Sequence, residues 1–185
     1  MKLQDLIHIS LFAALTAALG LVPRIDFAIV PVPITAQSLG PMLAGAILGA
    51  RRGALSQGLF LVLLAAGLPL LTGGRGGLGI FASPSAGFII AWPFAAAVTG
   101  WLVERFWQNL GFFKAYAATV IGGIGIVYLI GIPVLAVIAG MSLPAAIAGS
   151  AIFIPGDLVK AGLAASVAMF VKRGYPIINA APARE

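Results

Sequence analysis

The 185-residue sequence contains no cysteine and a single histidine, His8. The absence of cysteine excludes disulfides and thiolate metal sites. One histidine is too few for a histidine metal cluster, and we find no nucleotide-binding motif. Charged residues are also scarce, at 9% of the chain, whereas a soluble domain carries roughly 25%. We therefore expect a chain without metal, cofactor or enzymatic activity, and with too little polar surface to cover a globule in water.

Apolar residues are abundant instead, at 61% of the chain, with a mean hydropathy of +1.11. One membrane crossing needs about 20 apolar residues. Helices are expected, because the apolar runs are too long for barrel strands and lipid offers the backbone no hydrogen bonds. The sequence predicts an all-α bundle of six transmembrane helices, forming one membrane domain over residues 1–185. The predicted spans are 6–22, 35–50, 54–71, 86–103, 115–139 and 144–171.

The basic residues fall between these spans and predict the orientation of the chain. With both termini in the cytoplasm, the outer side holds only Arg24 and Arg75. The cytoplasmic side then holds eight basic residues: Lys2, Arg51, Arg52, Arg105, Lys114, Lys172, Arg173 and Arg184. We therefore expect a multi-pass protein of the bacterial cytoplasmic membrane, in contact with lipid. The net charge of +6 orients the chain and needs no nucleic-acid partner.

Two ionisable residues, Asp157 and Lys160, interrupt the sixth apolar span. Each charge costs on the order of 3 kcal/mol at the centre of a bilayer. Residues three apart share a helix face, and Pro155 and Gly156 weaken the helix just before them. Broken helices at membrane depth are tolerated where they line a cavity. The pair therefore predicts a ligand site, with a self-neutralising ion pair that tethers the helices as the alternative.

Two connections on the predicted outer side also carry candidate binding residues. Gly73, Gly74 and Arg75 lie in a glycine-rich loop, where backbone N–H groups and a guanidinium can bind an anion; a flexible turn is the alternative. The segment from Pro23 to Pro33 is apolar enough to cap a pocket, or else to lie in the membrane interface. Gln37, at the start of the second span, is a candidate ligand contact or a helix-start contact.

Small residues recur at a spacing of four on the first span, at Ala13 and Ala17 and again at Ala14 and Ala18. This spacing lets membrane helices approach closely. From the residues alone, packing within the protein is the favoured use of these positions.

Several of these segments, taken in order, resemble the BioY family, the biotin-binding S components of energy-coupling-factor (ECF) transporters. The resemblance covers residues of about 10 to 172 and is carried by five motifs: Pro31-Val32-Pro33-Ile34-Thr35-Ala36-Gln37, Gly67-Leu68-Pro69, Gly73 to Gly77, Ser83-Pro84-Ser85-Ala86-Gly87-Phe88, and Phe153-Ile154-Pro155-Gly156-Asp157-Leu158-Val159-Lys160.

The resemblance implies a membrane-embedded biotin-binding subunit with a pocket near the outer face. It implies that Asp157 and Lys160 contact biotin, and that Gly73, Gly74 and Arg75 enclose it. It implies docking of Ala13 and Ala17 on a transmembrane T component, with transport powered by two ATPase subunits.

The sequence departs from the family pattern at Phe88, where many members carry a tyrosine, so this ring lines the expected site without a hydroxyl. At Arg75, smaller polar residues also occur in the family. The alternative function is a stand-alone secondary vitamin carrier that uses Asp157 as a proton-coupling site.

Overall fold

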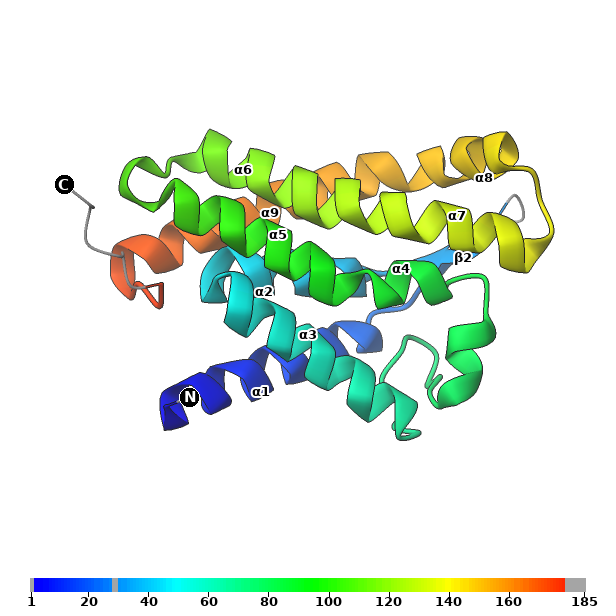
Figure 1. The fold of residues 1–185 in the computed structure, drawn as a ribbon, viewed down its shortest axis with the longest axis horizontal. Helices are drawn as coiled ribbons and strands as arrows, with labels where there is room; N and C mark the ends of the chain where they lie inside the picture. Colours follow the sequence, from blue (N-terminus) through cyan, green and yellow to red (C-terminus); the bar gives the residue numbers. More distant parts are fainter. Residues whose placement is uncertain (1, 28–29, 179–185) are drawn as a thin grey trace.

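The computed structural model describes residues 2–27 and 30–178. Over these residues, six helical segments pack side by side into an elongated bundle (Figure 1), which confirms the predicted all-α six-helix fold. In chain order they are α1 (Leu3–Ala18) with η1 (Leu19–Leu21); η2 (Ala36–Ser38) with α2 (Leu39–Leu48); α3 (Ala50–Ala65); α4 (Ala86–Ile90) with α5 (Trp92–Arg105); α6 (Phe112–Val120), η5 (Ile121–Ile126) and α7 (Val127–Ala139); and α8 (Leu143–Ser150), η6 (Ala151–Phe153) and α9 (Ile154–Gly174). Short 3-10 turns η3 (Leu78–Ala82) and η4 (Trp107–Asn109) lie in the connections.

Four of these six segments are long and apolar enough to cross a membrane, among the described residues. The second and third are shorter. The third ends at Ala65, earlier than the predicted 71, because Gly67 adopts a positive φ of 101° and Pro69 has no N–H to donate. The second is buried on all sides, since every residue of α2 lies in the core.

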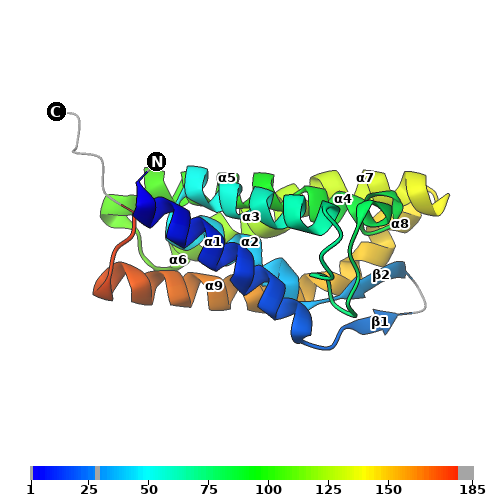
Figure 2. The ribbon, with the colours of Figure 1, turned by 90° about the horizontal axis from the view of Figure 1, so that it is seen from below.

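The apolar connection after the first span forms a β-hairpin, which the all-α prediction did not include. Strand β1 (Ile25–Phe27) pairs with β2 (Val30–Ile34) in antiparallel register, with Ile25 opposite Ile34. Pairing satisfies backbone groups that an extended apolar segment would otherwise leave without partners. Figure 2 shows the hairpin along one side of the bundle, next to the α8 end of the sixth segment.

Small residues let the inner helices approach closely around α2. A Cβ on Gly122 in the π-helical η5 would lie 2.7 Å from the backbone carbonyl oxygen of Ala95 in α5, and a Cβ on Gly45 in α2 would lie 2.8 Å from Thr99 Cβ. Both distances are far below ordinary van der Waals contact, so only glycine permits these crossings. Close contact between helix backbones therefore forms part of the core, alongside the packing of large side chains.

The two ends of the bundle differ. The start of α1, the α5–α6 connection and the end of α9 lie together at one end (Figure 1), and these elements carry Lys2, Arg105, Lys114, Lys172 and Arg173. The hairpin, the residues between α3 and α4, and the turn between α7 and α8 lie at the other end. Both ends of the described chain thus emerge on one side, as the prediction of an even number of spans requires.

Candidate functional site

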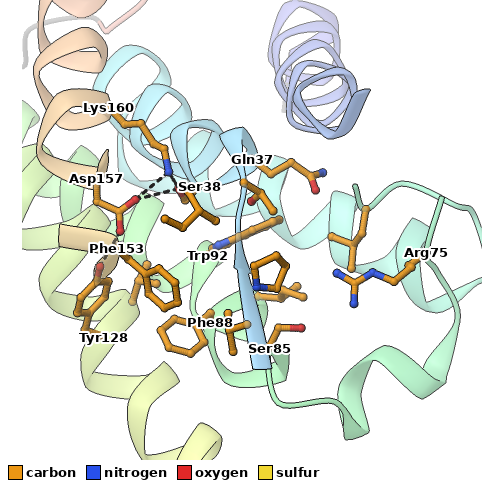
Figure 3. Close-up of a pocket in the computed structure, with 17 residues that line it drawn as sticks. Gln37, Ser38, Arg75, Ser85, Phe88, Trp92, Tyr128, Phe153, Asp157 and Lys160 are labelled. Carbon is orange, nitrogen blue, oxygen red and sulfur yellow. Dashed lines mark hydrogen bonds and ion pairs between the residues drawn. The ribbon is translucent and has the colours of Figure 1, made fainter. Parts of the chain in front are cut away.

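A pocket lies within the hairpin end of the bundle (Figure 3). Its walls come from β2, η2, the connection after α3, α4, α5, α7, η6 and the start of α9, so the second, fourth, fifth and sixth helical segments all border it. The lining residues are Val32, Pro33, Ile34, Thr35, Gln37, Ser38, Leu71, Arg75, Ser85, Phe88, Ile89, Trp92, Val127, Tyr128, Phe153, Asp157 and Lys160. Of the two uses predicted for the segment from Pro23 to Pro33, this position favours the cap.

Asp157 and Lys160 meet in this pocket, as predicted. The sixth segment breaks at η6, and Pro155 falls in the first turn of α9, where its missing N–H breaks no helical hydrogen bond. Asp157 lies in the same first turn, where the helix dipole favours a negative charge. Lys160 Nζ lies 2.9 Å from Asp157 Oδ1, and the Asp157 residue is only 6% exposed. The irregular 3-10 turn thus lies just before the Pro155-Gly156 position where a weakened helix was predicted, and the start of α9 aims the Asp157 carboxylate into the cavity.

Two further residues complete the polar end of the pocket, and the sequence analysis missed both. Ser38 Oγ donates to Asp157 Oδ1 at 3.2 Å and accepts from Lys160 Nζ at 2.8 Å. The Tyr128 hydroxyl donates to Asp157 Oδ2 at 2.7 Å (Figure 3). A signal was present for Tyr128, because it is a hydroxyl-bearing residue in the middle of the most apolar span. Ser38 carried no such signal, because serine is common near the start of any helix.

Aromatic rings form the wall facing these polar groups. Phe88 meets Tyr128 and Phe153 edge to face, with ring centroids 6.2 and 6.3 Å apart. Trp92 packs against Phe60 behind this wall. A Cβ on Gly131 of α7 would lie 2.5 Å from the Phe88 ring, so the absence of a side chain there makes room for the ring. The pocket therefore presents a charged end and an apolar, aromatic body.

Gln37 borders the pocket, but its amide is fully used inside the protein. Nε2 donates to the carbonyls of Thr16 at 3.1 Å and Leu70 at 2.9 Å, and Oε1 accepts from the backbone N–H and the hydroxyl of Thr72. The residue is 1% exposed. Gln37 thus ties α1 to the connection after α3, and its polar atoms have no hydrogen-bonding capacity left for a ligand.

The glycine-rich loop contributes Arg75 to the pocket, whereas Gly73 and Gly74 are exposed and lie outside the lining. Both glycines have positive φ, 82° and 70°, and close a tight turn. The N–H groups of Gly74 and Arg75 both donate to the Leu71 carbonyl, so these two are not open to an anion. Partial burial, then the neighbouring Arg24 guanidinium, lower the pKa of Arg75, while Asp26 opposes them. Arginine nevertheless stays charged at neutral pH.

The predicted docking residues lie on the inner side of α1. Ala13 is 3% exposed and belongs to the core, and Ala17 is partly buried against the same core. Ala14 and Ala18, which have the same spacing, are exposed. Internal packing, the use favoured by the residues alone, is therefore what the structure gives for Ala13. No group of three His, Cys, Asp or Glu side chains that could hold a metal comes together among the described residues.

Comparison with known proteins shows to which family the chain belongs. The BioY family profile matches residues 1–177. The biotin transporter BioY of Rhizobium etli is 50% identical over 97% of this chain and 99% of its own length. The probable biotin transporter BioY of Bacillus subtilis is 44% identical over 96% and 95%. The crystal structure of the S-component for biotin from an ECF-type ABC transporter superposes with a TM-score of 0.91 and 31% identity, covering 95% of this chain and 94% of that one.

These relatives are named as transporters, which is not a class of enzymes, and the solved S-component has the fold described above. The chain is accordingly a multi-pass membrane protein with the S-component fold, and it belongs to the BioY family.

Proposed function

We propose that the chain is the biotin-binding S component of an ECF-type uptake transporter, working with a transmembrane T component and two ATPase subunits. The relatives named as biotin transporters and the S-component for biotin support the ligand and the transporter class. The observation that carries the proposal is the hydrogen-bonding capacity left at the polar end of the pocket.

That capacity is one acceptor beside one donor. A carboxylate offers about four acceptor sites, and Asp157 uses three of them, on Ser38, Lys160 and Tyr128. An ammonium has three donors, and Lys160 uses two, on Ser38 and Asp157. Among the described residues, one acceptor site on Asp157 Oδ2 and one donor on Lys160 Nζ therefore have no partner. The cyclic urea of biotin presents an N–H next to a C=O, which matches this arrangement.

The rest of the pocket suits the rest of the ligand. The rings of Phe88, Trp92 and Phe153 offer apolar contact to the thiophane ring and the aliphatic chain of biotin. Arg75 lines the pocket from the loop after α3, and its guanidinium suits the terminal carboxylate. We infer that biotin binds with its urea toward α9 and its carboxylate toward the loop. Gly73 and Gly74 then shape the turn that presents Arg75.

The partner surface is proposed on the exposed face of α1. Ala14 and Ala18 lie on this face, with Ile7 and Leu11 beside them. Small residues four apart permit close approach of a neighbouring membrane helix. We therefore assign docking on the T component to Ala14 and Ala18, in place of the buried Ala13 and the partly buried Ala17.

In the alternative function, a stand-alone carrier, Asp157 would have to take up and release a proton during transport. Three donors already point at this carboxylate, and one of them is a cation at 2.9 Å. Protonation would have to break this arrangement, so the geometry favours a binding site over a proton site. The two functions differ in whether uptake needs the ATPases or a proton gradient.

The first prediction concerns the polar end of the pocket. We expect Asp157→Asn to weaken biotin binding by about 30-fold or more, because it leaves Lys160 without a counter-charge and removes an ionised acceptor. Tyr128→Phe should weaken binding by about tenfold, because loss of the hydroxyl that holds Oδ2 lets the Asp157 carboxylate rotate away from the ligand. Equilibrium binding of labelled biotin to the detergent-purified protein measures both.

Matched controls keep this test specific. Asp26→Asn removes an exposed carboxylate, and Tyr116→Phe removes a hydroxyl that makes no side-chain hydrogen bond among the described residues. Both should bind biotin as the unchanged protein does. Wild-type affinity in a well-folded Asp157→Asn variant would sink the proposed site.

The second prediction separates the two ends of the ligand. Arg75→Gln should weaken biotin binding by about tenfold through loss of one charge-assisted contact. Binding of biotin methyl ester, which has no carboxylate charge, should be the same in the variant and the unchanged protein. Arg24→Gln is the control, because Arg24 lies near the loop but does not line the pocket. An equal loss for acid and ester would show that Arg75 acts only on the fold of the loop.

The third prediction concerns partnership. Ala14→Trp should leave biotin binding unchanged and reduce uptake by at least tenfold in cells that express the T component and the ATPases, because a large ring prevents close helix approach. Ala117→Trp places the same ring on an exposed site of α6 and should support normal uptake. Full uptake by the Ala14 variant, or uptake by the chain alone that a protonophore abolishes, would contradict the assignment.

A further inference from the structure

A second hollow lies at the opposite end of the bundle from the biotin pocket, between the start of α6 and the end of α9. It has a volume of about 660 Å³. Its wall is apolar, from Leu110, Phe112, Met169 and Phe170, and two cations, Lys172 and Arg173, stand at the end of α9. Lys172 follows Asp157 by 15 residues on one helix, so the two sites are about 22 Å apart along its axis.

Lys172 is held in place at this groove by backbone carbonyls, with no acidic partner among the described residues. Its Nζ donates to the carbonyls of Trp107 at 2.7 Å and Leu110 at 3.2 Å, and lies 5.2 Å from the centre of the Trp107 ring. An ammonium has three donors, so one remains. The ion pairs found over residues 2–27 and 30–178 involve Arg24, Arg52 and Lys160, and the lining of the groove contains no acidic residue. The groove therefore carries two positive charges that nothing in its walls neutralises.

The apolar wall faces outward. Phe170 is 78% exposed and Phe112 is 43% exposed, and Phe112 stacks on Tyr116 further along α6. In a membrane protein such rings face lipid chains. Trp107 and Lys172 are residue types that mark the boundary between the hydrocarbon and the headgroups. The cations thus lie at headgroup level, with the apolar wall extending from them along the helices.

We propose that this groove binds an anionic phospholipid, with the phosphate of the headgroup at Lys172 and Arg173 and an acyl chain along Phe112 and Phe170. Basic pockets between transmembrane helices are suited to anionic headgroups. A free phosphate would use the cations but leave the apolar wall bare, and a zwitterionic lipid would bring its own positive charge to two uncompensated ones. The arrangement therefore selects a lipid that is both anionic and chain-bearing.

Native mass spectrometry of the full chain in detergent, titrated with phosphatidylglycerol or phosphatidylcholine, tests this. We expect phosphatidylglycerol to stay bound under activation that strips phosphatidylcholine, with at least threefold higher occupancy. Arg173→Gln should lower that occupancy by at least threefold without disturbing the fold, because this side chain makes no hydrogen bond among the described residues. Lys172→Gln with Arg173→Gln should abolish the preference.

Lys2→Gln with Arg51→Gln is the matched control, since it removes two charges at the same end of the bundle, beside a different hollow. This variant should keep the preference. The proposal is overturned if both lipids stay bound equally, if the control loses phosphatidylglycerol as strongly as the groove variants do, or if millimolar inorganic phosphate displaces the lipid.

Discussion

The structure depends on how a carboxylate and an ammonium are accommodated between apolar helices. A charge at membrane depth costs on the order of 3 kcal/mol, and removing one member of a buried pair leaves the other uncompensated. The break at η6 places Asp157 in the first turn of α9, where backbone dipoles favour it, and Lys160 neutralises it from one turn away. Ser38 and Tyr128 then occupy most of the remaining polar capacity. Little hydrogen-bonding capacity is left at this end of the pocket, and the proposed ligand is matched to what remains.

The segment η2 links this polar end to the rest of the protein. Ser38 binds the charged pair, and its neighbour Gln37 binds the Thr16 carbonyl in α1 and the backbone at Leu70 and Thr72. Two adjacent side chains thus join the pocket, the loop that carries Arg75 and the helix proposed to face the T component. These hydrogen bonds, at 2.9 to 3.2 Å, connect the polar end of the pocket to α1 and to the loop through η2.

The sequence was sufficient for the six-helix fold and for the charged pair, because hydropathy and an ionisable residue inside an apolar run are local signals. It was insufficient wherever a residue's role depends on which helix faces which. The sequence leaves Gln37 open as a ligand contact or a helix-start contact, whereas in the structure its amide binds α1 and the loop after α3. Ala13 and Ala14 are equivalent in spacing, and only the packing of α1 shows which one is buried. The hairpin was missed because a short apolar connection has no pattern that separates a strand pair from an interfacial segment.

Competition by two biotin analogues tests most directly whether the acceptor on Asp157 and the donor on Lys160 bind the urea of the ligand. Desthiobiotin keeps the urea and lacks the sulfur, whereas 2-iminobiotin replaces the urea C=O with a C=N–H group that is protonated at neutral pH. Desthiobiotin should displace labelled biotin with an affinity within about tenfold of biotin itself, because a few apolar contacts are all that it loses. 2-Iminobiotin should be weaker by about 100-fold or more, because its cation would face the Lys160 ammonium. Equal competition by the two analogues, or stronger binding of 2-iminobiotin, would contradict the account.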